Sequence, residues 1–174
     1  KQGNYLKVSD FSGAMIDLFD SKDGKSVLDP TGKSFCIEMQ LYLPTIENDN
    51  EVIFQRVGED TTVSAGQNHF GVTLALSESN SALLTNVTTT GSIQAILSSG
   101  SFAISTEMRV EKGVWNHIAA VFDQGKDTLS LYRNAELQST SQVGSFGLGA
   151  VLAPISIASG SKHEAFKVLF EPKH

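Results

Sequence analysis

Acidic side chains gather in two turn-rich stretches of the chain. One stretch carries Asp20, Asp23 and Asp29, and the other is the acidic loop 47–51 with Asp49 at its centre. Carboxylate and carbonyl oxygens are the hard ligands that calcium prefers. These four aspartates could therefore act as oxygen ligands of a metal ion. Solvated turn carboxylates that bind no ion are the competing interpretation, and the one favoured for each loop.

Catalysis by a retaining glycoside hydrolase needs two carboxylates about 5 Å apart. On one face of a strand such a pair would be spaced Glu-x-Asp or Glu-x-x-x-Glu. The nearest approach is Glu38 with Gln40, which offers one carboxylate and one amide. Glu107 and Glu111 fall across a strand end and are interpreted as solvated. The sequence therefore predicts that the chain is not an enzyme.

Histidine and cysteine offer no catalytic pattern either. The chain has four histidines without metal-ligand spacing or a neighbouring Ser or Cys that would form a triad: His69, His117, His163 and His174. Cys36 is the only cysteine, so no internal disulfide is expected. It lies in the apolar run Phe-Cys-Ile, which predicts a buried and inert thiol.

Charge and hydropathy narrow the range of partners. The formal net charge is -6, and Lys and Arg are scattered singly, so there is no basic stripe to neutralise phosphates and no nucleic-acid partner is expected. The apolar runs are far shorter than the roughly 20 residues that span a bilayer, so no membrane insertion is expected. Lys1 opens the chain without a Met or a cleavable leader, as in an excised domain or a processed secreted protein.

Apolar and polar residues alternate with period two in many short segments that end at Gly, Pro, Asn, Asp or Ser, which predicts an all-β chain. The expected strands are Tyr5–Val8, Phe35–Leu43, Val52–Val57, Phe70–Leu76, Ala82–Thr88, Ser92–Leu97, Phe102–Ser105, Trp115–Phe122, Thr128–Tyr132, Ile155–Ala158 and Ala165–Phe170. Ala14–Phe19 is the best candidate for a short helix, with a turn as the alternative. With 174 residues and about ten strands, the chain is expected to form one domain over residues 1–174, an antiparallel two-sheet β-sandwich or jelly roll.

One hairpin is more specific than the rest. Residues 112–123 read Lys-Gly-Val-Trp-Asn-His-Ile-Ala-Ala-Val-Phe-Asp, and a turn at 124–127 leads into Thr-Leu-Ser-Leu-Tyr-Arg-Asn. This pattern resembles the laminin G-like and concanavalin A-like lectin family, in which such a Trp-x-His strand precedes a Leu-x-Leu-Tyr strand. Residues 34–41 resemble the opening core strand of that family. Tyr5-Leu-Lys-Val upstream and Ile155-Ser-Ile-Ala downstream also resemble the family, so the resemblance covers most of the stretch from Tyr5 to Ala158.

The resemblance carries expectations for individual residues. It places Trp115 and His117 inside the sandwich as structural residues, rather than as a sugar platform or a catalytic base. Laminin G-like domains often hold calcium in rim loops, so the resemblance also makes calcium the candidate cofactor and places Asp49 near the position of a calcium-binding Asp. The family has Asn-Gly after the Tyr strand where this chain has Asn134-Ala135, so a turn that tolerates a Cβ atom is expected in place of a type I′ turn. Three aromatic residues are further platform candidates, each interpreted as packed: Tyr42, Tyr132 and Phe146.

The function that follows by analogy is a non-catalytic recognition module of a larger extracellular or cell-surface protein. It would bind a glycan or an extracellular protein in adhesion. The alternatives are a structural spacer or assembly domain of a multidomain surface or viral protein, and a module that targets a carbohydrate-active enzyme. Asn86-Val87-Thr88 matches the N-glycosylation acceptor pattern, which has meaning only in a secretory context.

Overall fold

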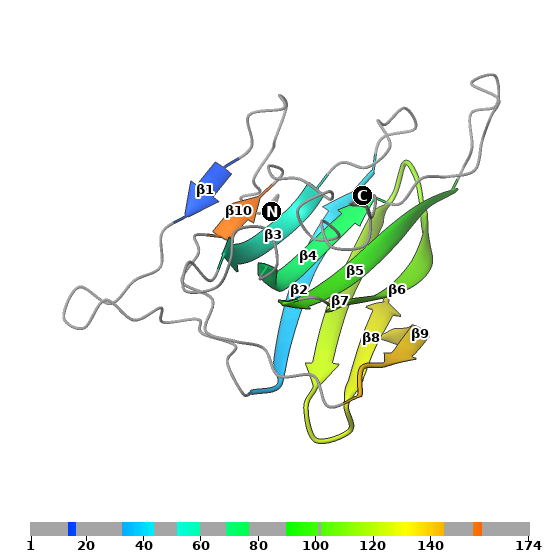
Figure 1. Ribbon diagram of the computed structural model, residues 1–174. Coiled ribbons are helices and arrows are strands. Elements are labelled where there is room, and N and C mark those ends of the chain that lie inside the picture. The colour runs from blue at the N-terminus through cyan, green and yellow to red at the C-terminus, as the bar shows by residue number, and fades with distance from the viewer. Residues whose placement is uncertain are drawn as a thin grey trace, which may run out of the picture.

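The computed structural model of the chain describes residues 14–16, 33–43, 52–59, 69–76, 90–100, 102–144 and 155–157. These residues form ten strands in two antiparallel sheets (Figure 1). The predicted all-β sandwich is confirmed. The strands are β1 (Ala14–Ile16), β2 (Phe35–Tyr42), β3 (Val52–Glu59), β4 (His69–Leu76), β5 (Thr90–Gly100), β6 (Phe102–Glu111), β7 (Trp115–Asp123), β8 (Thr128–Arg133), β9 (Glu136–Gln142) and β10 (Ile155–Ile157).

The larger sheet has six strands in the order β1-β10-β3-β4-β5-β6, and the smaller sheet has four in the order β2-β7-β8-β9. The hydrophobic core fills the space between them, because alternate residues of each strand point to one face. From the larger sheet, Leu74, Ile93 and Leu97 are fully buried in this core. From the smaller sheet, Ile118 and Leu131 meet them. The period-two pattern of the sequence thus defines an inner and an outer face for each sheet.

The β2–β7 pair sets the geometry of the smaller sheet. Its register runs without a break from Phe35 opposite Phe122 to Tyr42 opposite Trp115. Along β2, half-buried and exposed residues alternate strictly, with Phe35 on the half-buried side. Along β7, alternate residues from Asn116 to Phe122 are buried, and those between them are not. The alternation of the sequence with period two is thus confirmed for both strands.

Polar side chains link the two sheets at β6 and β9. The Thr106 hydroxyl donates to Ser139 Oγ over 2.9 Å, and the Ser141 hydroxyl donates to the backbone oxygen of Ser105 over 2.9 Å. These inward serines take the place of apolar residues. Strand β9 therefore lacks the alternation of apolar and polar residues, and the sequence analysis did not predict it.

The prediction of a short helix or turn at Ala14–Phe19 is wrong for its first part, since Ala14–Ile16 forms strand β1 antiparallel to β10. Three residues pair with β10 there, and this ladder satisfies their backbone groups as a helix would have done. The strands predicted at Tyr5–Val8, Ala82–Thr88 and Ala165–Phe170 lie outside the described residues. The extent of the domain over residues 1–174 stays a prediction.

The turn between β8 and β9 keeps the backbone of a type I′ hairpin. Asn134 has φ 51° and Ala135 has φ 67°, and positive φ at both central residues is the signature of that turn. The expectation that Ala135 would change the turn type is therefore wrong. The strong right-handed twist of the hairpin imposes the left-handed conformation, and the alanine adopts it in spite of its Cβ atom.

The turn between β7 and β8 is fixed by an aspartate. Asp123 Oδ1 accepts hydrogen bonds from the backbone N–H groups of Gly125 at 3.0 Å and Lys126 at 3.2 Å. The Lys126 ammonium lies 3.3 Å from Oδ2. The hydrogen bond from the Lys126 side chain, followed by the backbone hydrogen bonds, lowers the pKa of Asp123. Its ionised form thus holds the turn in place at neutral pH.

Candidate functional site

The outer face of the six-stranded sheet is closed to solvent where β4 pairs with β5, whereas Glu107 and Arg109 on β6 are exposed. Thr73, Ala75 and Ile96 point away from the core yet are fully buried. The polar groups on this face are hydrogen-bonded to each other, for example Gln55 Nε2 to the Thr73 hydroxyl over 3.0 Å. A ligand therefore has no access to this part of the sheet.

The outer face of the four-stranded sheet is open and carries two exposed aromatic rings. Tyr42 at the end of β2 is 47% exposed, and Trp115 at the start of β7 is 55% exposed. The two residues are direct cross-strand partners, with ring centroids 5.6 Å apart and planes tilted by 57°. The expectations that Trp115 is enclosed in the sandwich and that Tyr42 is packed are wrong. Both residues fall on the outward phase of their strands, and no described element covers them.

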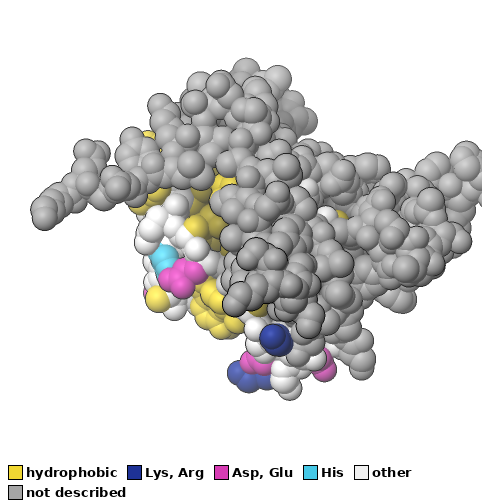
Figure 2. Space-filling model, turned by 90° about the vertical axis from the view of Figure 1, so that its left-hand side faces the viewer, with side chains coloured by type: hydrophobic (Ala, Val, Ile, Leu, Met, Phe, Trp, Pro, Cys, Tyr) yellow, Lys and Arg dark blue, Asp and Glu magenta, His cyan; other side chains and the backbone are white. Residues whose placement is uncertain are grey.

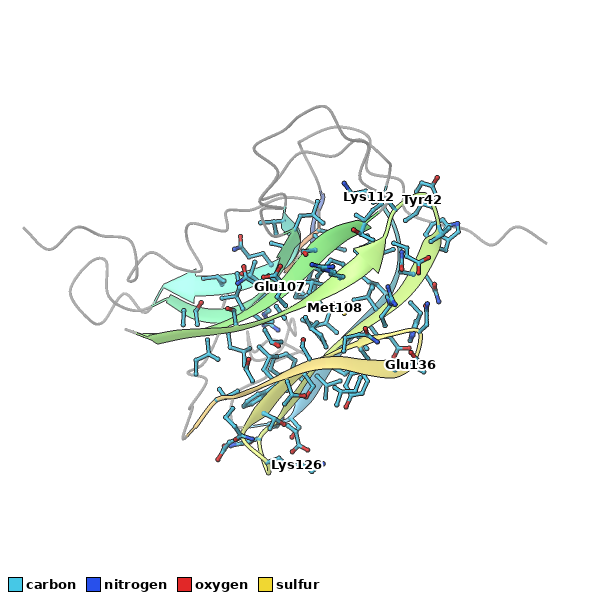
Figure 3. All side chains as sticks on the ribbon, turned by 90° about the vertical axis from the view of Figure 1, so that its right-hand side faces the viewer. Tyr42, Glu107, Met108, Lys112, Lys126 and Glu136 are labelled. Atoms are coloured by element: carbon cyan, nitrogen blue, oxygen red, sulfur yellow. The ribbon has the colours of Figure 1, made fainter. Side chains whose placement is uncertain are left out.

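The turn before β7 positions this aromatic pair. Gly113, with φ 75°, donates its N–H to the backbone oxygen of Leu43 over 2.8 Å and so ties the turn to the end of β2. The buried Asn116 side chain donates to the backbone oxygens of Glu111 at 2.8 Å and Val114 at 3.2 Å. Figure 3 shows that Tyr42 lies at the same end of the sandwich as Lys112 of this turn. Hydrogen bonds of Gly113 before Trp115 and of the Asn116 side chain after it therefore fix the position of Trp115.

A carboxylate and a histidine lie next to the aromatic pair. His117 Nε2 is 2.6 Å from Glu38 Oε1, and both side chains are partly exposed. His117 is the cross-strand partner of Gln40. It follows Trp115 by two residues along β7, so both side chains lie on the same face. Its backbone is fixed by Asn134, whose Oδ1 accepts from the His117 N–H over 3.0 Å. The expectation that His117 lies inside the sandwich is wrong, because its side chain points outward.

We name this surface the β2–β7 face, and it consists of Glu38, Gln40, Tyr42, Trp115 and His117. Figure 2 shows part of the surface where a histidine lies beside a carboxylate with hydrophobic side chains around them. Aromatic faces bind apolar C–H groups, and the carboxylate, amide and imidazole exchange hydrogen bonds with hydroxyl groups. The arrangement fits a ligand that has both kinds of surface, such as a pyranose ring.

Cys36 continues the same row of outward residues along β2. Its side chain is exposed, so the prediction of a buried thiol is wrong. Strict alternation places Cys36 in phase with Glu38, and its apolar neighbours Phe35 and Ile37 point the other way. Partial burial raises the pKa of the thiol, and the nearby charge of Glu38 raises it further. The thiol is therefore accessible, but the raised pKa disfavours its reactive thiolate form.

Several sequence-based candidates lie outside the described residues: Asp20, Asp23, Asp29, Asp49, Asn86, Phe146, His163 and His174. His69 begins β4. Tyr132 is half-buried on β8. Among the described residues, no group of three or more His, Cys, Asp or Glu side chains is arranged to hold a metal ion. The same part of the chain contains no helix that could cross a membrane.

Two asparagines that support the site were not predicted to do so from the sequence. Asn116 is buried and fixes the turn that carries Trp115, and Asn134 fixes the backbone of His117. A signal for Asn116 exists, since an amide on the apolar face of a strand needs hydrogen-bond partners from nearby backbone. For Asn134, the signal is its place in a two-residue hairpin loop.

The model of the concanavalin A-like lectin/glucanases superfamily matches residues 17–169 of this chain. None of the curated proteins matches this chain. Among solved structures, the Ruminococcus gnavus IT-sialidase CBM40 bound to α2,6-sialyllactose is similar, with a TM-score of 0.57, 18% identity, and coverage of 88% of this chain and 78% of that one. Its complex with α2,3-sialyllactose gives a TM-score of 0.55, 20% identity, and coverage of 88% and 77%. At these identities the likeness shows the fold.

Proposed function

We propose that this chain, which belongs to the concanavalin A-like lectin/glucanase superfamily, is a carbohydrate-binding module that holds its glycan on the β2–β7 face. The observation that carries the proposal is the exposed pair of Tyr42 and Trp115 beside the Glu38–His117 hydrogen bond. Large aromatic side chains are costly to expose, and a rigid exposed pair beside polar groups is typical of a ligand platform. A sugar ring would stack on Trp115 and exchange hydrogen bonds with Glu38.

The Glu38–His117 pair gives the proposed platform a defined polarity. In the tautomer that carries the proton on Nε2, His117 donates to Glu38 Oε1 and leaves Nδ1 as an acceptor for a ligand. Glu38 Oε2 is a second acceptor. Sugar hydroxyl groups are donors to both atoms. The hydrogen bond between the two side chains also limits their rotation, which lowers the entropy lost on binding.

The module is proposed to act without catalysis of its own, in an extracellular or cell-surface protein. The β2–β7 face has one carboxylate, Glu38, where glycoside hydrolysis with retention requires two about 5 Å apart. The similarity to a module of a sialidase supports a role in which the module holds a glycan for an enzyme or for adhesion. Calcium remains a proposed accessory ion, with Asp20, Asp23, Asp29 and Asp49 as its ligands.

The experiment is a glycan array that includes both sialylated and uncharged glycans, probed with the purified chain in calcium and in a chelator. We expect binding to a defined glycan class. For the glycan that binds, the variant Trp115→Ala should lose about 30-fold in affinity, because a central stacked Trp contributes about 2 kcal/mol. Leu137→Ala is the matched control, since Leu137 is also exposed, at 57%, but lies on β9.

The outcomes separate the parts of the proposal. An equal loss for Trp115→Ala and Leu137→Ala would remove the β2–β7 face as the site. If the chain binds no glycan on the array, either in calcium or in the chelator, the glycan-binding function is wrong. Binding that persists in the chelator would overturn the calcium proposal and leave the aromatic platform in place.

A further inference from the structure

Strand β2 forms one edge of the four-stranded sheet, and this edge has no strand beside it among the described residues. All eight residues of β2 pair with β7 in one unbroken register. The strand contains no Pro, Gly or Lys and no bulge. Proteins usually protect an exposed edge with one of these features, because unpaired N–H and C=O groups recruit further strands. The β2 edge lacks them.

The inner side of β2 is also incompletely covered. Ile37, Met39 and Leu41 point toward the core but are only half-buried, whereas Ile118 and Ala120 on the neighbouring β7 are fully buried. The inward-facing side chains of β2 are thus less buried than those of β7. A further strand beside β2 would cover these apolar side chains as β2 covers those of β7.

The opposite edge of the same sheet is different. Strand β9 is polar, with the sequence Glu-Leu-Gln-Ser-Thr-Ser-Gln, and its register with β8 shifts at Leu131/Tyr132. Ser139 and Ser141 of β9 are hydrogen-bonded to β6 of the other sheet. Such an irregular and polar edge is a poor template for another strand. The contrast singles out β2 as the edge that can be extended.

We propose that the β2 edge pairs antiparallel with β2 of a second copy of this chain, about a two-fold axis that passes between the two Met39 residues. In an antiparallel ladder, the side chains of opposed residues lie on the same face of the sheet. The two-fold axis must therefore pass midway between two copies of the same residue. A centre at Glu38 would oppose two carboxylates, which is unfavourable. If the axis passed at Ile37 or at Gln40, fewer residues of β2 would be paired than with the axis at Met39.

The Met39 centre is self-complementary in charge and in hydropathy. It places Glu38 opposite the partner's Gln40 and Ile37 opposite the partner's Leu41, and Cys36 faces the partner's Tyr42. The carboxylate therefore meets an amide donor, and the half-buried apolar row closes on itself. The two sheets become one sheet of eight strands. If the proposed glycan site holds, both sites lie on the same side of that sheet, which allows one branched or repeated glycan to engage two copies.

The test measures the molar mass of the chain by light scattering over a wide range of concentration. We expect a monomer–dimer equilibrium for the wild type. Gln40→Glu would oppose carboxylates at two positions of the dimer and should weaken it roughly tenfold. The double variant Glu38→Gln with Gln40→Glu restores each carboxylate–amide pair and should restore the dimer. Gln142→Glu makes the same change on exposed β9 and should have no effect.

A second measurement reports the register. In a Cys36→Ser background, Met39→Cys should form an interchain disulfide under mild oxidation, because the two positions face each other. The wild-type Cys36, which faces Tyr42, should not. A monomer at every concentration, or a dimer that Gln40→Glu leaves unchanged, would overturn the proposal. Protection of β2 amides from hydrogen exchange by an added extended peptide, with a monomeric chain, would assign the edge to a different partner. None of these readouts depends on glycan binding, so the two proposals fail separately.

Discussion

Replacement of Ala135 by glycine should stabilise the chain. Ala135 has φ 67° in the β8–β9 turn, where a residue with a Cβ atom pays about 1–2 kcal/mol relative to its preferred conformations. Glycine removes that cost but gives up about 0.5–1 kcal/mol through the greater freedom of the unfolded chain. At the middle of both ranges, the difference leaves a net gain of about 0.5–1 kcal/mol. For a chain of this size the gain corresponds to a rise of about 1–4 °C in Tm.

The assay is equilibrium unfolding in urea, with the midpoint and the slope measured for the wild type and for Ala135→Gly. Ala119→Gly is the control, since Ala119 lies in the middle of β7 without a positive φ and should lose about 0.5–1 kcal/mol. Opposite signs for the two variants are the expected result. If Ala135→Gly destabilises the chain as Ala119→Gly does, the type I′ assignment and the reasoning from φ are wrong.

Three further predictions concern the sheet, the site and the thiol. Gly71→Ala should cost about 3 kcal/mol or more in urea unfolding, because the new Cβ would lie 1.9 Å from the Arg56 backbone oxygen; an unchanged midpoint would contradict the β3–β4 geometry. Asn116→Ala should cost about 1–3 kcal/mol, since two backbone acceptors lose their donor, and should also weaken glycan binding through Trp115; a loss of stability with intact binding would deny Asn116 its positioning role. Alkylation of Cys36 should be slow at neutral pH and should accelerate only in alkaline solution, because the raised pKa of the thiol delays formation of the thiolate. Glu38→Gln should speed alkylation modestly at a given pH by lowering that pKa, and an identical rate would show that the carboxylate does not act on the thiol.

The sequence predicted strands wherever one face is apolar. The two faces of β2 and β7 follow directly from the alternation around Met39 and Ile118, and the structure confirms them. The prediction from the sequence missed strand β9, because Ser139 and Ser141 on its inner side form hydrogen bonds instead of apolar contacts. No periodicity reports that kind of contact.

The candidate site was harder to predict, because exposure depends on which strand forms an edge. Alternation alone put Cys36 in phase with Glu38, yet the apolar neighbours of Cys36 in the sequence favoured burial. Trp115 was assigned to the interior from the family pattern, whereas its outward phase on β7 leaves it open to solvent. The cross-strand contact of Trp115 with Tyr42 joins residues far apart in the sequence, and it requires the β2–β7 register to be known.

The most direct test of glycan binding at the β2–β7 face uses the intrinsic fluorescence of the chain. Trp115 is its only tryptophan, so the emission reports on this one site. Titration with the glycan selected on the array should shift or quench the emission along a saturable curve, with the same Kd as calorimetry. Binding in the calorimeter without any change in Trp115 emission would contradict the account and place the glycan elsewhere on the molecule.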